Sequence, residues 1–348
     1  MRTWKHRFIG LKLALAPGLP LLLLGAGAPA WAAEGQGGLL DLFYFLQQCL
    51  NALQVSTFYG LLAAAYVLIY GITRRINLAF GALAMWGGYL VVLGVTVIFA
   101  VTPLGLLGAA LLALAYALGA TALLGWVLQR SLVLPLLGRP SLALLILTIG
   151  LAIVLEEVMR LAQGNRERWL RPLLDDPLLA VEGAGFVLQL TVMRGLIVLA
   201  ALGLGLGLLL FLARHRFGRR WRACTQDHGM AALCGVDVGA TLALTFALAS
   251  LYAAAAGAII AFYYGNVSFY MGTVLGLKAL LAAVVGGLTS VGGALLGGLL
   301  LGCLESFWSA YFPVEYRDPA VLGVLILIMI ARPQGLLAPA EARDREAI

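Results

Sequence analysis

The chain has 348 residues, of which 62% are hydrophobic and 11% charged, and its mean hydropathy is +0.99. These values lie far outside the range of soluble domains, so they exclude a soluble protein and predict a chain that crosses a membrane several times. The net charge of +7 does not indicate a nucleic-acid partner, because the basic residues lie at the ends of apolar runs rather than on one soluble face.

The first 33 residues differ in pattern from the rest of the chain. Lysines and arginines within residues 2–12 precede an apolar stretch, and the small residues of 28–33 have the spacing of a cleavage site. This pattern predicts a signal peptide at 1–33, with a retained anchor helix as the alternative. Residues 34–41 are then expected to form a short periplasmic segment.

Apolar runs near 20 residues long recur after this segment and predict an all-α membrane helix bundle of eight or nine spans. The bundle forms a transmembrane domain at 42–338, and residues 339–348 form a cytoplasmic tail. The seventh and eighth runs are short enough to form a hairpin or a re-entrant pair. The predicted spans are 42–72, 77–100, 104–129, 141–161, 190–213, 239–263, 274–289 and 292–310, with a further run at 319–331.

Basic residues determine the predicted orientation, because lysine and arginine next to a span are translocated poorly. With residues 34–41 outside, most lysines and arginines of the transmembrane domain fall in inner loops. The outer loop 162–189 carries both signs of charge, so we expect a solvated loop, with contact to a binding protein as the alternative. The largest inner cluster lies between the fifth and sixth spans and consists of Arg214, Arg216, Arg219, Arg220 and Arg222.

A partly apolar segment, 221–235, overlaps the end of this arginine cluster. It includes Trp221, Ala223, Met230, Ala231 and Leu233, and it predicts a short helix that a cytoplasmic protein grips. An interfacial helix bound to lipid headgroups is the alternative. The arginines themselves are expected mainly to fix the topology and to attract anionic membrane lipid.

Motifs for nucleotide binding and catalysis are missing from the sequence. The only lysines are at positions 5, 12 and 278, and none ends a phosphate-binding GxxxxGK motif, so ATP must be handled by another chain. Ser290 lacks the nucleophile-elbow pattern, and the histidines and cysteines show no metal-ligand or CxxC spacing. We therefore expect no catalytic residue, no cofactor and no metal, and we do not expect an enzyme.

Six segments, taken together and in this order, carry a resemblance to a known family. They are YGITRRINLAFG (70–81), RACTQDHGMAALCG (222–235), FYYGNVSFYMG (262–272), KALLAAVVGGLTSVGGA (278–294), EYRD (315–318) and RPQGLL (332–337). Over about residues 42–338 the chain resembles the H-type permease subunit of branched-chain amino acid ABC importers. The resemblance implies an all-helical pore that works with a second permease subunit, two cytoplasmic ATPase subunits and a periplasmic substrate-binding protein.

Two positions depart from the pattern that the resemblance implies. Phe80 stands where the family usually has a histidine, which removes any polar role there. Met230 and the two alanines after it replace the Glu-Ala-Ala of the general importer motif, which leaves no glutamate for an ion pair with an ATPase. The resemblance still favours ATPase docking by this segment, through Arg222, Ala223, Asp227, Met230, Ala231, Ala232, Leu233 and Gly235.

Charged residues inside spans are further candidates, because burying a charge in lipid is costly. Lys278 and Glu305 share a depth on neighbouring spans of opposite direction, which predicts an ion pair that fixes the seventh and eighth spans near the outer mouth. Separate snorkelling of the two side chains is the alternative. Glu156 is expected to pair with Arg160, one helical turn away.

The glycines of 286–302 are expected to let helices pack closely. The alternative is that the turn 286–293 exposes backbone that lines the transport pathway. The residues assigned to the pathway or to its outer mouth are Asn77, Gly81, Asn266, Lys278, Gly286, Gly287 and Glu305.

These features together predict an inner-membrane permease that moves branched-chain or related small amino acids or amides by alternating access. A secondary, ion-coupled transporter is the alternative, but the intramembrane acids lie toward the outer ends of their spans rather than near the midplane. A passive channel would have no use for the docking segment. No residue in the sequence distinguishes one small substrate from another.

Overall fold

The structure, a computed structural model, describes residues 37–103, 105–136, 141–170, 173–174, 176–183, 186–332 and 335–337. The expected signal or anchor segment at 1–33 and the expected tail at 339–348 lie outside the described residues. Of the expected periplasmic segment at 34–41, residues 37–41 are described, and they form the first turns of a helix.

Most of the described chain is helical. The helices are α3 (Gly37–Thr73), α4 (Phe80–Val101), α5 (Leu106–Leu128), α6 (Ser141–Gln163), α7 (Val192–Arg214), α8 (Arg216–Gln226), α9 (His228–Leu233), α10 (Val238–Tyr264), α11 (Met271–Gly286), α12 (Val291–Tyr311) and α13 (Arg317–Ala331). Shorter helical turns are Gln129–Val133, Leu134–Leu136 and Val314–Tyr316, and the strands are β1 (Arg168–Trp169), β2 (Pro177–Gly183), β3 (Phe186–Thr191) and β4 (Asn266–Val267).

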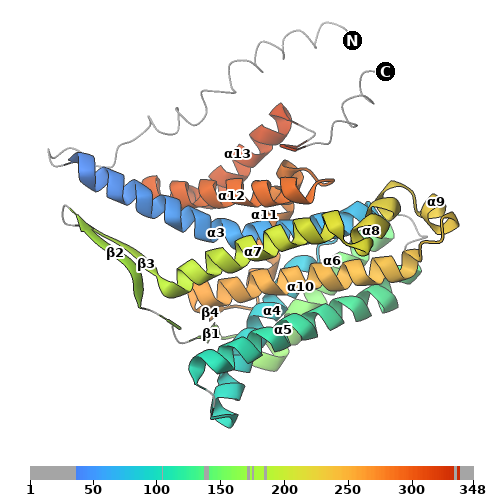
Figure 1. Cartoon of the computed structure of the whole chain (residues 1–348), viewed down its shortest axis with the longest axis horizontal. Coiled ribbons are helices and arrows are strands. Elements are labelled where there is room, and N and C mark those ends of the chain that lie inside the picture. Colours follow the sequence, from blue (N-terminus) through green and yellow to red (C-terminus); the bar gives the residue numbers. More distant parts are fainter. Residues whose placement is uncertain are drawn as a thin grey trace, which may run out of the picture.

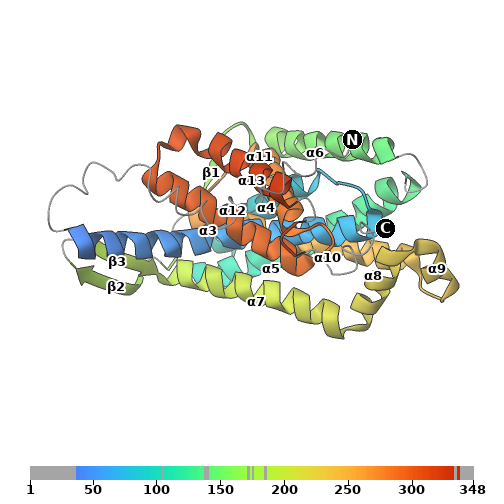
Figure 2. The ribbon, with the colours of Figure 1, turned by 90° about the horizontal axis from the view of Figure 1, so that it is seen from above.

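Helix α3 is the central element of the bundle. It lies between α7 and α12 and runs along the longest axis of the molecule (Figures 1 and 2). The apolar window of α3 is 89% buried, whereas those of α5, α6 and α7 are 28% buried. The peripheral helices therefore present apolar surface that suits contact with lipid, and α3 is enclosed by protein.

Seven described helices are long and apolar enough to cross a membrane: α3, α4, α6, α7, α10, α12, and α5 with the turns that continue it. The predicted span 274–289 corresponds to α11, which has only 16 residues, and the run 319–331 to α13, which has 15. At about 1.5 Å per residue, such helices are shorter than a hydrocarbon core of about 30 Å. The predicted count of eight or nine spans is therefore not confirmed.

Glycine contacts hold the central helices close together, as the sequence predicted for residues 286–302. A Cβ atom at Gly298 would overlap the backbone of Gly60 in α3, and one at Gly302 would overlap Ser56 one turn further along. Because α3 and α12 approach backbone to backbone, this contact does not rely on a hydrophobic driving force, which lipid cannot supply between helices.

The outer loop 162–189 contains strands that the sequence analysis did not predict. Strands β2 and β3 form an antiparallel hairpin, and β1 pairs with β4, with Trp169 opposite Asn266. The segment is therefore not an irregular loop, but its charged residues Arg166, Glu167, Arg168 and Asp176 are exposed, as a solvated segment requires. The all-α class holds for the bundle but not for this end of it. The pairing of β1 with β4 joins segments almost 100 residues apart, which local patterns cannot reveal.

Candidate functional site

The basic loop after α7 folds into two short helices that form a hook (residues 216–237) at one end of the bundle (Figures 1 and 2). Helix α8 is fixed to the central helix α3 by Trp221, whose indole N–H donates to the backbone oxygen of Leu68 at 3.1 Å. The ring lies against Gly71, where a Cβ atom would come within 2.6 Å of it. Cys224, one turn along, is also buried, and this burial raises the pKa of its thiol.

Two arginines add polar contacts between the hook and the bundle. Arg74, just after α3, donates through Nη2 to the backbone oxygen of Thr225 at 2.7 Å. Arg222 donates through Nη1 to the backbone oxygen of Leu212 in α7 at 3.0 Å. Helix α8 is therefore attached to both α3 and α7, and a force applied to the hook acts on two membrane helices.

Helix α9 projects from the attached part of the hook. Asp227 caps its first turn, because its Oδ1 accepts from the backbone N–H groups of Gly229 at 2.7 Å and Met230 at 3.0 Å. The apolar side chains of Met230 and Leu233 are 63% and 84% exposed. The chain then turns at Gly235, where φ is +79°, a backbone conformation that favours glycine.

The structure divides the predicted docking residues into an exposed and an internal group. Trp221 and Ala231 are buried in the protein, so the prediction that a partner grips these two side chains is wrong. Ala223 is half-buried. An apolar residue of a short amphipathic helix can cover its own core or a partner, and sequence alone does not separate these cases. The exposed group is Arg222, Asp227, Met230, Ala232, Leu233 and Gly235.

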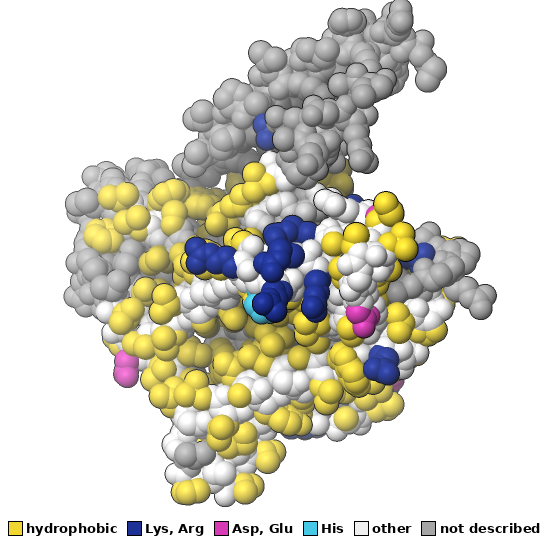
Figure 3. Space-filling model, turned by 45° about the vertical axis from the view of Figure 1, so that its right-hand side comes forward, with side chains coloured by type: hydrophobic (Ala, Val, Ile, Leu, Met, Phe, Trp, Pro, Cys, Tyr) yellow, Lys and Arg dark blue, Asp and Glu magenta, His cyan; other side chains and the backbone are white. Residues whose placement is uncertain are grey.

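The end of the molecule that carries the hook is basic. Arg214, Arg216, Arg219, Arg220 and Arg222 are all exposed, and Figure 3 shows basic side chains gathered on this end, with few acidic ones among them. Exposed arginine at one end of a helix bundle is the pattern expected for the cytoplasmic side.

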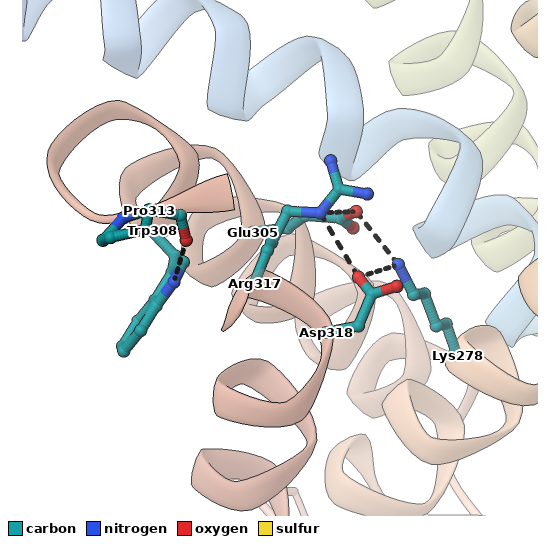
Figure 4. A network of polar contacts seen from close by, with 6 residues as sticks. All are labelled: Lys278, Glu305, Trp308, Pro313, Arg317 and Asp318. Atoms are coloured by element: carbon teal, nitrogen blue, oxygen red, sulfur yellow. Dashed lines mark hydrogen bonds and ion pairs between the residues drawn. The ribbon is translucent and has the colours of Figure 1, made fainter. Parts of the chain in front are cut away.

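A network of charges joins α11, α12 and α13 (Figure 4). Lys278 Nζ lies 3.0 Å from Glu305 Oε1 and 2.8 Å from Asp318 Oδ1. Arg317 Nε lies 3.3 Å from the same Glu305 oxygen and 3.2 Å from Asp318 Oδ1. The predicted ion pair of Lys278 with Glu305 is therefore confirmed, and separate snorkelling of the two is wrong.

Arg317 and Asp318 are members of this network that the sequence analysis missed. They begin α13. Together with Lys278 and Glu305 they form a closed ring of two cations and two anions. The signal in the sequence was an adjacent Arg-Asp pair in a connection between two apolar runs. Among the described residues, Lys278 and Glu305 are the only buried charged residues, with 6% and 7% of the whole residue exposed.

The carboxylate and guanidinium groups of α6 pair differently from the prediction. Arg160 forms its ion pair with Glu157, and Glu156 instead accepts a hydrogen bond of 2.5 Å from the Thr273 hydroxyl of α11. The predicted pair of Glu156 with Arg160 is therefore wrong. Both glutamates lie about one helical turn from Arg160, so their spacing along the chain allows either to pair with it. The position of α11 decides between them, because Thr273 of α11 binds Glu156 and leaves Glu157 to pair with Arg160.

A polar cavity of about 300 Å³ lies beside the charge network. Arg194 of α7 is half-buried there, and its guanidinium carbon lies 5.6 Å from the centre of the Tyr263 ring. Asn266 lies near the same end of α10, where its side chain donates to Glu167 at 3.3 Å. The residues that line the cavity are Gln47, Gln48, Asn51, Val55, Arg194, Tyr263, Tyr264, Glu305, Ser306, Ser309 and Arg317.

The turn after α11 is covered by the chain's own C-terminal segment. The backbone oxygens of Val285 and Gly286 accept from the N–H groups of Leu336 at 2.8 Å and Leu337 at 3.3 Å. Gly286 packs against Gly293, and Gly287 has a φ of +111°. The carbonyl groups left free by the end of α11 are thus satisfied internally, which supports the packing interpretation of these glycines over exposed backbone.

Asn77 and Gly81 lie where the chain enters α4. Asn77 is buried, and its Oδ1 accepts from the backbone N–H of Ala79 at 3.0 Å. Gly81 contacts the backbone of α11 at Gly272, where a Cβ atom would overlap it. Phe80, between them, is fully buried and packs with Tyr66 and Phe246, so this position is part of an aromatic cluster.

A family model described as branched-chain amino acid transport system / permease component matches residues 48–330. The chain belongs to this permease family. It is 34% identical over 306 residues to the high-affinity branched-chain amino acid transport system permease protein LivH of Salmonella typhimurium, covering 86% of this chain and 97% of that protein. The permease protein BraD of Pseudomonas aeruginosa is 34% identical over 305 residues, with 86% and 98% coverage.

A more distant relative is the probable permease protein LivH of Methanocaldococcus jannaschii, which is 27% identical over 297 residues, 83% of this chain and 89% of that protein. No solved structure matches the chain significantly. The permease is thus a multi-pass protein of the inner membrane, and its family is a transport family rather than an enzyme family. As a permease component, it works in a system with other subunits.

Proposed function

We propose that this permease moves branched-chain amino acids across the inner membrane as part of an ATP-driven importer. The proposed assembly contains a second permease subunit, two cytoplasmic ATPase subunits and a periplasmic substrate-binding protein. Support comes from the family and from the function of the LivH and BraD relatives as branched-chain amino acid permeases, which the chain matches over most of both lengths.

The hook is the observation that carries the mechanism. One part of it is attached to α3 and α7 by Trp221 and Arg222, and the other part exposes Met230 and Leu233. A cytoplasmic ATPase that binds the exposed side chains and closes on nucleotide would displace α8 and, through it, the central helix α3. Alternating access then follows from the movement of α3 against α12, with the pathway opening at one end as it closes at the other.

The opposite end of the bundle is proposed to receive the substrate. Lys278 and Glu305 hold α11 against α12, and the polar cavity lies next to them. We assign Asn266 to this outer mouth as well, and we keep Asn77, Gly81, Gly286 and Gly287 as structural elements of the moving helices.

An ion-coupled transporter is the second candidate, and the charge network argues against it. Such a transporter needs a carboxylate or unwound backbone that can bind and release an ion near the middle of the membrane. In the described part of the chain the one buried carboxylate, Glu305, already contacts Lys278 and Arg317, and the broken end of α11 is capped by residues 336–337.

Reconstitution tests this proposal. The permease, its partner subunits and the binding protein are placed in proteoliposomes, and uptake of labelled leucine is measured with ATP, with a non-hydrolysable analogue and without nucleotide. We expect uptake only with ATP. Uptake without nucleotide that follows an ion gradient would establish the ion-coupled alternative instead.

A matched pair of variants tests the hook. Leu233→Glu places a charge on the most exposed apolar residue of α9, and Gln226→Glu places the same side chain on the exposed end of α8. We expect Leu233→Glu to reduce ATP-driven uptake at least tenfold and to weaken copurification of the ATPase, because a charge at a buried interface core is costly. Gln226→Glu should retain both uptake and copurification of the ATPase. Equal effects of the two variants would contradict the assignment of α9 as the ATPase-docking helix.

A further inference from the structure

The polar cavity beside the charge network has the size and composition of a small-molecule site. Its volume is about 300 Å³, at the lower end of the range for ligand pockets. Side chains from α3, α7, α10, α12 and the start of α13 line it, and all but one of them carry a polar group. A cavity at the meeting point of helices from both halves of the chain can change shape when those helices move.

Arg194 supplies a guanidinium group that no carboxylate satisfies. None of the ion pairs in the described part of the chain involves Arg194, whose guanidinium group instead lies over the face of Tyr263. Arg317, the other arginine of the cavity, already contacts Glu305 and Asp318. A half-buried guanidinium with unused donors is suited to bind a carboxylate through two parallel hydrogen bonds.

Acceptors for an ammonium group lie on the α12 side of the same cavity. Ser306 is only 8% exposed, and its hydroxyl makes no hydrogen bond within the described residues. Both cations of the network contact the Oε1 atom of Glu305, which leaves Oε2 without an ion-pair partner. Buried polar groups almost always have a hydrogen-bond partner, so an unpartnered hydroxyl beside a cavity indicates that a ligand or water supplies it.

We infer that this cavity is a transit site for a zwitterionic α-amino acid. Arg194 binds the carboxylate, and the Ser306 hydroxyl together with Glu305 Oε2 accepts from the ammonium group. Because Lys278 and Arg317 already compensate the charge of Glu305, the ammonium is held weakly, which suits a site that must release its ligand onward. This inference rests on the proposed function, since it assumes that amino acids reach this end of the permease.

Saturation-transfer NMR on the full transporter in lipid nanodiscs, without the binding protein, tests the inference. The probes are leucine and 3-methylbutylamine, which has the same side chain and amine but no carboxylate. We expect leucine to receive saturation from the protein and the amine to bind at least tenfold more weakly. Thermal unfolding and nucleotide hydrolysis establish that each variant is folded and assembled.

Four variants locate the site. Arg194→Gln should weaken leucine binding at least tenfold, and Arg194→Lys should weaken it less, because lysine keeps the charge but lacks the planar pair of donors. Ser306→Ala removes a hydroxyl with no internal partner, so folding is retained, and we expect about fivefold weaker binding. Arg166→Gln removes an exposed arginine that does not line the cavity, and it should change nothing.

Absence of leucine binding, equal binding of leucine and the amine, or unchanged binding in the folded Arg194 variants overturns the transit site. If Arg194→Gln does not assemble, Arg194→Lys and Ser306→Ala decide the question. Uptake separates this failure from failure of the proposed function. Normal ATP-driven leucine uptake with an unaffected Arg194→Gln variant refutes only the site, whereas no ATP-driven uptake by the native assembly refutes the function.

Discussion

Removal of Lys278 is predicted to destabilise the protein mainly through Glu305. The two side chains are 8% and 10% exposed and their charged atoms are 3.0 Å apart, so this is a buried ion pair. Loss of one partner of a buried pair costs about 3–5 kcal/mol, because the other charge stays in a poorly solvated site. In Lys278→Met, Arg317 still contacts Glu305 at 3.3 Å, so we expect the lower end, about 3 kcal/mol.

The double variant Lys278→Met with Glu305→Met removes both buried charges at once. Well-packed apolar replacements of a buried pair are close to neutral, so its cost should be no larger than that of either single variant. The double-mutant cycle then gives a coupling free energy of at least about 3 kcal/mol, because the two single costs together exceed the double cost by at least the cost of one single variant. The matched cycle of Lys278 with Asp318, whose side chain is 48% exposed, should give less than about 1 kcal/mol.

The free energy of unfolding, measured by SDS titration in mixed micelles, supplies all the values for both cycles. A coupling below about 0.5 kcal/mol for Lys278 with Glu305, or equal coupling in the two cycles, would refute the argument that burial governs the strength of this network.

The charge-swapped double variant gives an independent check on the four-member network. An isolated pair would tolerate Lys278→Glu combined with Glu305→Lys. In this structure the new glutamate would face Asp318 and the new lysine would face Arg317, and like charges at such distances repel. We therefore expect no recovery of stability or uptake, and full recovery would show that α13 does not contribute.

Three further predictions concern the hook and the helix packing. Trp221→Ala removes the ring that fixes α8 to α3, and it should lower the free energy of unfolding by about 3–5 kcal/mol. A loss below about 1 kcal/mol would contradict this anchoring role. Exposed Cys234 should react with a membrane-impermeant maleimide added to the cytoplasmic side. Buried Cys224 should react slowly, and its rate should rise with pH because burial raises the pKa of its thiol. Labelling of Cys234 from the outside would reverse the orientation. Gly298→Ala should destabilise the α3–α12 contact in the unfolding assay. Its control, Gly323→Ala, has open space around the new Cβ and should be neutral or stabilising by up to about 1 kcal/mol. Similar effects of the two variants on the unfolding free energy would show that close packing is not required.

The sequence alone determined those features that depend on neighbouring residues along the chain. Apolar runs specify membrane helices because a backbone in lipid must satisfy its own hydrogen bonds, and the flanking arginines predict the orientation. The pair of Lys278 and Glu305 was also predictable, since the depth of each charge follows from its distance to the end of its run. The position of the hook between the fifth and sixth predicted spans came from the same local reasoning.

Tertiary structure decided the features that depend on which helices meet. Helices α3 and α5 have similar hydropathy, so hydropathy did not show that α3 is enclosed and α5 is peripheral. Nor did the sequence show that Trp221 faces inward while Leu233 faces outward. The pairing of β1 with β4, the choice of Thr273 as the partner of Glu156, and the closing of the charge network by α13 all join distant segments. An apolar sequence specifies that helices form in lipid. How the helices pack depends on small residues and a few polar groups that must meet their partners on other helices. Those partners are distant in sequence, so only the tertiary structure shows which of them meet.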